Sequence, residues 1–114
     1  MKKRIKTKEI NHIVEIAKSI EINAEFDKED NAFDFQFFSP KGQDFNFRVD
    51  AGEDLNSFEK NLYNYYENFD PEEETIMWAN NVGLGKRGVP NSLRALLDDM
   101  EWCEKKILEF YNLL

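Results

Sequence analysis

The sequence predicts an α+β fold with an N-terminal helix, a small antiparallel sheet of two or three Phe-rich strands, and three C-terminal helices. Three observations support this prediction. Apolar residues recur at three- and four-residue steps before residue 21 and after residue 54, which is the spacing of amphipathic helices. Between these segments, Phe alternates with polar residues at the period of two that is typical of strands. At 114 residues, 41% of them hydrophobic, the chain can bury one core, so we expect a single domain over residues 1–114.

The first expected element is a helix over residues 7–20, because Ile10, Ile13, Val14, Ala17 and Ile20 share one helical face. The basic residues 1–6 before it are expected to form a frayed tail that aids solubility.

Cellular location is inferred from charge and cysteine content. Charged residues interrupt the stretch that follows the basic start, so we expect no export signal. No uncharged apolar run approaches the ~20 residues that cross a bilayer. Cys103 is the only cysteine, which excludes an internal disulfide and fits a reducing compartment. These features indicate a soluble, cytoplasmic protein with no membrane partner.

The sheet is expected from three segments. Residues 23–26 form a short first strand, which a turn-prone polar cluster over residues 27–31 would end. Residues 33–38 and 45–50 alternate between aromatic and mostly polar side chains on either side of a turn at residues 39–43, so we expect a hairpin. Its two apolar rows would lie on one face, which helices must cover. These rows are Phe33, Phe35, Phe37, Phe45, Phe47 and Val49.

Three helices are expected to supply that cover. The second helix spans residues 55–69, with Asp54 or Asn56 as its cap. A third begins at Pro71, with Asp70 as its cap, because Pro suits the first helical position and the acidic first turn complements the helix dipole. It should end near Asn81, before the glycine-rich residues 82–90.

The last helix has the clearest periodicity in the chain. It should begin after Asn91 or Ser92 and continue to Leu114, a length of ~34 Å at 1.5 Å per residue. Its apolar stripe is expected to be Leu93, Leu96, Leu97, Met100, Cys103, Ile107, Phe110, Tyr111 and Leu114.

Motifs that carry chemistry are weak. The segment over residues 83–88 lacks the spacing of a phosphate-binding loop and follows a helix, so it is interpreted as a connection or a contact loop. Carboxylate pairs such as Asp98 with Asp99 are interpreted as a solvated helix face. His12 and Cys103 have no companions that would complete a zinc site or a catalytic pair, and Cys103 is expected in the core. We therefore expect no catalytic residue, no metal and no cofactor.

Aromatic residues that could stack on bases are present, including Trp78, Trp102 and the tyrosines of residues 63–66. Single-strand binders combine such rings with a positive groove, whereas the tyrosines lie among carboxylates. Direct, sequence-specific nucleic-acid binding is therefore disfavoured.

Negative charge is concentrated in the middle of the chain. Residues 21–81 contain sixteen carboxylates and only four cations, in a chain whose net charge is −8. Such a field repels nucleic acid and attracts a basic groove on another macromolecule. This concentration is the main functional indication in the sequence.

The second half of the chain resembles small proteins carried by phages and mobile elements. The resemblance rests on the stretch from Asn68 to Trp78 and on Gly88-Val89-Pro90-Asn91-Ser92-Leu93-Arg94-Ala95-Leu96, which opens the last helix. Small acidic phage-borne proteins include anti-CRISPR and anti-restriction inhibitors. The resemblance therefore implies a non-enzymatic inhibitor of host defence, most simply an anti-CRISPR that acts on a type II or type VI RNA-guided nuclease in the bacterial cytoplasm.

Such an inhibitor would place its acidic surface in the basic groove that binds guide RNA or target. Two alternatives stay open: a structural module of a mobile element, with a homodimer formed through the last helix, and a small metal-dependent nuclease. The residues expected to contact the partner are Asp34, Asp44, Asp50, Glu53, Asp54, Glu72, Glu73, Glu74, Lys86 and Arg87.

Overall fold

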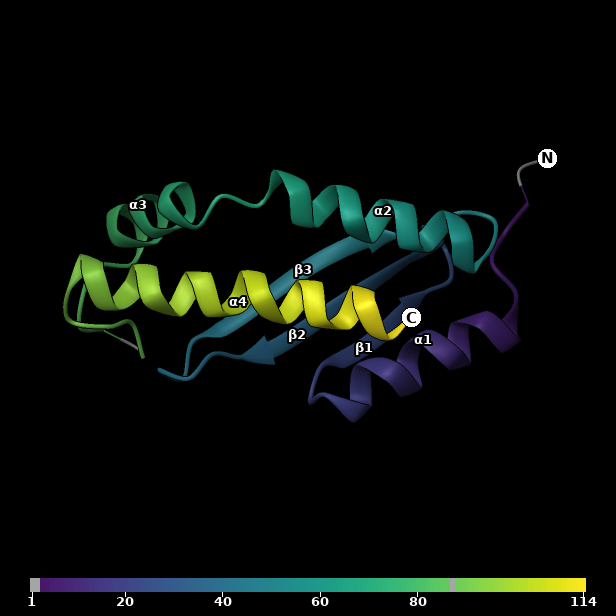
Figure 1. Cartoon of the computed structure of the whole chain (residues 1–114), viewed down its shortest axis with the longest axis horizontal. Coiled ribbons are helices and arrows are strands. Elements are labelled where there is room, and N and C mark those ends of the chain that lie inside the picture. Colours follow the sequence, from purple (N-terminus) through teal and green to yellow (C-terminus); the bar gives the residue numbers. More distant parts are fainter. Residues whose placement is uncertain (1–2, 87) are drawn as a thin grey trace.

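The computed structural model describes residues 3–86 and 88–114, and it confirms the α+β prediction. Arg87, one of the expected contact residues, lies outside the described residues. Four helices and a three-stranded antiparallel sheet of order β1-β2-β3 make up this part of the chain (Figure 1). The elements are α1 (Thr7–Ser19), β1 (Asn23–Asp27), β2 (Ala32–Phe38), β3 (Asp44–Asp50), α2 (Leu55–Asn68), α3 (Pro71–Asn81) and α4 (Leu93–Leu113).

Helix α1 ends in a tight reversal that leads into β1. The backbone N–H of Ile22 donates to the carbonyl of Ala17 at 2.9 Å, and that of Glu21 donates to the carbonyl of Lys18 at 3.1 Å. This pair of bonds is the Schellman motif, which requires a left-handed residue just after the helix. Glu21 takes that position, with φ 63°, although glycine usually fills it.

Residues 3–6, before α1, differ from the frayed tail expected over residues 1–6, of which residues 1–2 lie outside the described residues. Ile5 is buried in the core, and the guanidinium of Arg4 donates to the backbone carbonyls of Lys28 and Glu29 in the β1–β2 turn. Hydrophobic burial and these bonds hold the segment against the domain, which the basic composition did not reveal.

The strand register places aromatic residues on one face of the sheet. Phe35 of β2 lies opposite Ala24 of β1 and Phe47 of β3, and Phe37 lies opposite Phe45. Both predicted apolar rows are buried, as the period of two requires. The ring centroids of Phe35 and Phe47 are 5.1 Å apart, so cross-strand aromatic contact adds to the stability of the pairing.

Helices cover this aromatic face and leave the other face of the sheet open. Helix α1 packs along β1, α2 packs along β3, and α4 crosses the strands beside α2 (Figure 1). Phe110 of α4 contacts Phe35 at a centroid distance of 5.1 Å, and Phe58 of α2 contacts Phe33 at the same distance. Helix α3 packs on α4, at the end of the 47 Å long molecule that is remote from the N-terminus (Figure 1).

The helix starts follow local capping chemistry. The carboxylate of Asp54 accepts from the backbone N–H of Ser57 at 2.8 Å, and the carboxylate of Asp70 accepts from that of Glu72 at 3.0 Å. Ser92 caps α4 by accepting from the backbone N–H of Ala95 at 3.2 Å. These side chains satisfy donors that a helix terminus leaves without intrahelical partners.

Helix α4 departs from its predicted apolar stripe in two places. Leu93, the first residue of the helix, is 53% exposed. Asp99, interpreted from the sequence as part of a solvated face, is 3% exposed. Its carboxylate accepts hydrogen bonds from the side-chain amide of Gln43 and, at 3.3 Å, from the backbone N–H of Lys41. Asp99 therefore pins the β2–β3 turn to α4.

The burial of two side chains of α4 bears on predictions made from the sequence. A dimer formed through α4 would use its large aromatic residues Trp102, Phe110 and Tyr111. Phe110 is fully buried in its own domain and cannot supply such a contact, whereas Trp102 is exposed and Tyr111 is half-buried. Cys103 is buried, as expected, and burial raises the pKa of its thiol to about 12.

Over residues 3–86 and 88–114, none of the helices combines the length and apolarity that a membrane span needs.

Candidate functional site

The candidate site is the face of the sheet that no helix covers, called here the open sheet face. It consists of the outward-pointing side chains of the three strands, and most of them are exposed. Five of these side chains are carboxylates and one is a guanidinium, so the surface is anionic. The open sheet face comprises Asn23, Glu25, Asp27, Ala32, Asp34, Gln36, Phe38, Asp44, Asn46, Arg48 and Asp50.

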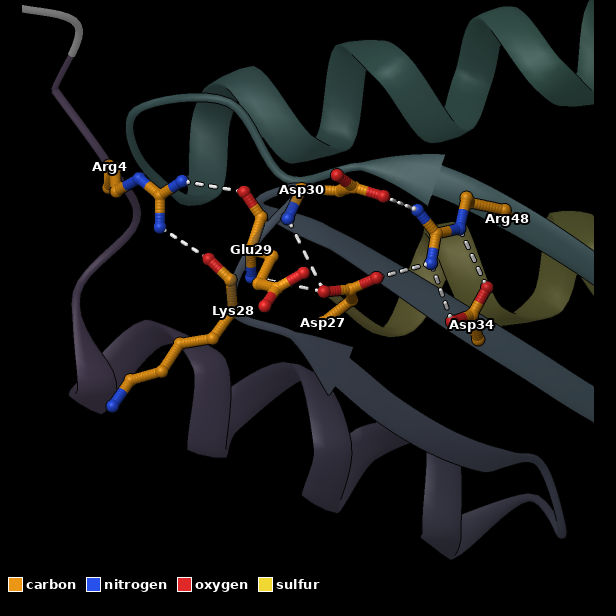
Figure 2. Close-up of polar contacts among 7 residues, drawn as sticks. All are labelled: Arg4, Asp27, Lys28, Glu29, Asp30, Asp34 and Arg48. Carbon is orange, nitrogen blue, oxygen red and sulfur yellow. Dashed lines mark hydrogen bonds and ion pairs between the residues drawn. The ribbon is translucent and has the colours of Figure 1, made fainter.

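Arg48 organises one half of this face through three carboxylates (Figure 2). Its guanidinium binds Asp34 through two parallel bonds, from Nε to Oδ1 at 2.8 Å and from Nη2 to Oδ2 at 2.9 Å. It also donates to Asp27 at 2.7 Å and to Asp30 at 2.9 Å. Such two-pronged pairing restricts the geometry as well as adding energy. We call Arg48, Asp27, Asp30 and Asp34 the Arg48 cluster.

The β1–β2 turn is held from two sides. Arg48 binds the side chains of Asp27 and Asp30, while Arg4 binds the carbonyls of Lys28 and Glu29 (Figure 2). The carboxylate of Asp27 also accepts from the backbone N–H of Glu29 at 3.0 Å, which closes a local turn. The acidic end of the sheet is thus a shaped surface, with its carboxylates in defined positions.

The other half of the open sheet face carries a chain of amides. The side-chain amide of Asn23 donates to Gln36 at 2.7 Å, and that of Gln36 donates to Asp44 at 2.8 Å. Asn46 donates to the same Asp44 carboxylate at 3.1 Å. Phe38, 63% exposed, lies beside Asp44 in the register and is the large apolar group on this face.

The charges of the Arg48 cluster stabilise one another. Hydrogen bonds from Arg48 hold the pKa of Asp27 and of Asp34 below the usual range. The same bonds, that to Asp34 first, raise the pKa of Arg48. Both carboxylates therefore keep their charge well into the acidic range.

The expected contact residues do not form one patch. Asp34, Asp44 and Asp50 lie on the open sheet face. Glu53 and Asp54 lie in the exposed connection to α2, near the N-terminal end of the molecule, and Asp54 is used as a helix cap (Figure 1).

The remaining expected residues lie at the opposite end. Glu72 and Glu73 are exposed on the first turn of α3, whereas Glu74 is half-buried. Burial, and then the neighbouring Glu73, raise the pKa of Glu74. Lys86 is exposed in the connection to α4. Glu72, Glu73 and Glu74 belong to a separate surface, because α3 packs on α4. The connection that carries Lys86 lies against the β2–β3 turn, where a Cβ atom on Gly88 would come within 3.2 Å of the carbonyl oxygen of Gly42.

Sequence reasoning missed Glu25, Asp27 and the chain of amides. The signal was present in the alternation, because Glu25, Asp34 and Arg48 occupy equivalent outward positions of three strands and share one row of the register. Recognising it required the register, which the spacing within each strand does not specify.

The open sheet face offers fixed carboxylates and side-chain amides to a binding partner. Among the residues that the structure describes, no group of three or more His, Cys, Asp or Glu side chains is placed to hold a metal ion. In the Arg48 cluster, the guanidinium itself occupies the space that the three carboxylates share. The chain matches no protein-family model, no curated protein and no solved structure.

Proposed function

We propose that this protein is a non-enzymatic inhibitor that binds another protein through the open sheet face. The observation that carries the proposal is that a whole sheet face is left without a helix and bears five carboxylates against one arginine. A partner that complements this surface presents lysines and arginines, as a nucleic-acid-binding groove does.

The hydrogen bonds of the open sheet face support this role. Carboxylates fixed by the Arg48 cluster and by the chain of amides lose little freedom on binding, so little affinity is spent on ordering them. Charge complementarity of this kind speeds association and makes it sensitive to salt.

The partner that we propose is an RNA-guided nuclease of type II or type VI, with or without its guide RNA. Its positively charged channel holds a nucleic-acid backbone, and an anionic protein surface would compete for the same cations. The resemblance of residues 68–78 and 88–96 to phage and mobile-element proteins favours this partner, and the site of action would be the cytoplasm of an infected bacterium. The inhibited step would be guide or target engagement.

The experiment compares two triple variants with the same change in charge. Glu25→Gln, Asp34→Asn and Asp44→Asn together neutralise three carboxylates of the open sheet face. We expect inhibition of target cleavage, and binding to a purified nuclease, to weaken roughly tenfold, at ~0.5 kcal/mol per exposed charge.

The control triple variant carries Glu15→Gln, Glu67→Gln and Glu109→Gln, which lie on three helices and are exposed. Its affinity should stay within about twofold of that of the unchanged protein, because it alters net charge but not the open sheet face. Equal losses in both variants would indicate a non-specific charge effect, and binding that persists in the first variant would refute the proposal.

A second candidate function has a specific observation in its favour. Among the residues that the structure describes, nine large hydrophobic side chains are exposed, and five of them fall between residues 76 and 93, on α3, its connection and the start of α4. A structural module that self-associates would bury them. Sedimentation velocity across a range of concentrations, with Ile76→Ser and Leu93→Ser as variants, tests this function, and a monomer at all concentrations would exclude it.

A further inference from the structure

A cleft lined by more basic than acidic side chains lies next to the anionic open sheet face. It has a volume of about 540 Å³ and lies between the end of α1, the end of β2 and the middle of α4. Pockets of this size hold small organic ligands. The side chains that define it are Lys18, Glu21, Asn23, Phe38, Trp102 and Lys106, and we call it the lysine-tryptophan cleft.

The charge of the lysine-tryptophan cleft reverses that of the chain. Two lysines, Lys18 and Lys106, line it together with one acidic residue, Glu21. Within the described part of the chain, neither lysine forms an ion pair with a carboxylate. Arg48, in contrast, is shared by three carboxylates. The two ammonium groups are therefore available to an anion.

Aromatic surface lies beside these cations. Trp102 is 36% exposed, and its ring rests edge-to-face on buried Phe37 at a centroid distance of 6.0 Å. The Nζ atom of Lys106 lies over the Trp102 ring, 5.2 Å from its centroid, and this cation–π contact holds the ammonium against the indole. Phe38, at the end of β2, adds a second exposed ring to the lining of the cleft. A ligand here meets aromatic surface and positive charge together.

We propose that the lysine-tryptophan cleft binds a mononucleotide, with the base against the aromatic side chains and the phosphate between Lys18 and Lys106. Lysine recognises phosphate as a point charge, whereas planar carboxylates are more often matched by the fork of arginine, which the cleft lacks. Base stacking on Trp or Phe tolerates any base, because every base has a π-face.

The size of the ligand follows from the surroundings of the cleft. The anionic open sheet face adjoins it, since Asn23 and Phe38 belong to both. A long polynucleotide crossing that face would be repelled, whereas a single nucleotide places its few charges beside the two lysines only. The proposal therefore concerns a free nucleotide, and it does not depend on the docking partner.

The test is titration of the ¹⁵N-labelled protein with adenosine 5′-monophosphate at millimolar concentration, followed by NMR. We expect the indole N–H of Trp102 and the backbone amides near Lys18 to shift, while the indole of Trp78 on α3 serves as an unperturbed reference. Adenosine alone and inorganic phosphate alone should each bind more weakly, because each satisfies half of the site. Absence of saturable shifts at Trp102 would overturn the proposal.

Charge variants sharpen the result. Lys18→Gln and Lys106→Gln should each raise the dissociation constant roughly 2- to 5-fold, as for exposed ion pairs. Lys8→Gln and Lys105→Gln are the matched controls, since these lysines are exposed on the same two helices but do not line the cleft. Equal affinity in all four variants would overturn the proposal. Tighter binding of a short acidic, tryptophan-containing peptide at the same residues would assign the cleft to a protein partner and would also overturn it.

Discussion

Replacing Asp99 with alanine is expected to destabilise the fold by about 3 kcal/mol. Asp99 is buried on α4 and accepts from the side-chain amide of Gln43 and the backbone N–H of Lys41. A hydrogen bond to a charged group contributes about 1.5–3 kcal/mol. The backbone N–H of Lys41 can turn to water in its exposed turn, but the amide of Gln43 is buried and would lose its partner. Loss of the buried hydrogen bond to Gln43 therefore accounts for most of the expected decrease in the free energy of unfolding.

The asparagine variant separates hydrogen bonding from burial. In Asp99→Asn, the retained oxygen can still accept from Lys41, and the new amide can donate to Oε1 of Gln43 if that side chain turns over. This Oε1 atom is buried without a hydrogen-bond partner among the described residues. The number of buried groups without partners then stays the same, so the expected loss is about 1 kcal/mol for exchanging a charged bond for a neutral one.

The measurement is urea unfolding followed by far-UV circular dichroism, with Asp98→Ala as the control. Asp98 is the neighbouring residue, 65% exposed, and its contact with Arg94 at 3.9 Å is long, so its loss should fall within about 0.5 kcal/mol. For Asp99→Ala, the thermal midpoint should fall by roughly 10–15 °C. If Asp99→Ala unfolds at the same urea concentration as Asp98→Ala, the argument that Asp99 pins the turn to α4 is wrong.

Three further variants test local features, each by urea unfolding. Glu21→Gly should raise the free energy of unfolding by about 1 kcal/mol, because glycine adopts the left-handed backbone of this position without strain, and an unchanged midpoint would contradict this. Arg48→Gln should lower stability at neutral pH. Because Arg48 lowers the folded-state pKa of Asp27 and Asp34, its contribution is complete above their ordinary value of 3.8 and is lost as pH falls through the lowered values. A stability difference between Arg48→Gln and the unchanged protein that did not shrink in acid would argue against this coupling. Glu74→Gln should raise stability at neutral pH. Burial raises the folded-state pKa of Glu74, so the unchanged protein loses stability as pH rises from the ordinary value of 4.5 through the raised folded-state pKa. Identical pH profiles of stability for Glu74→Gln and the unchanged protein would refute this prediction.

The elements themselves could be predicted from the sequence because their causes are local. The period-two Phe rows specified which face of β2 and β3 is buried. Candidate caps marked the helix starts: Asp70 was the one candidate for α3, while Asp54 and Ser92 are the caps that the structure selects from two candidates each. The acidic character of the outward rows followed from the same alternation, so Asp34, Asp44 and Asp50 could be named in advance as exposed.

Contacts between distant segments were decided only by the tertiary structure. Strand register brings Asp27 and Asp34 to Arg48, and the β2–β3 turn folds back onto α4 where Asp99 is buried. Helix packing places Lys18 beside Trp102, 84 positions later in the sequence. The physical reason is that periodicity describes one segment at a time, whereas a site depends on which segments meet, and this is determined by packing of the whole core.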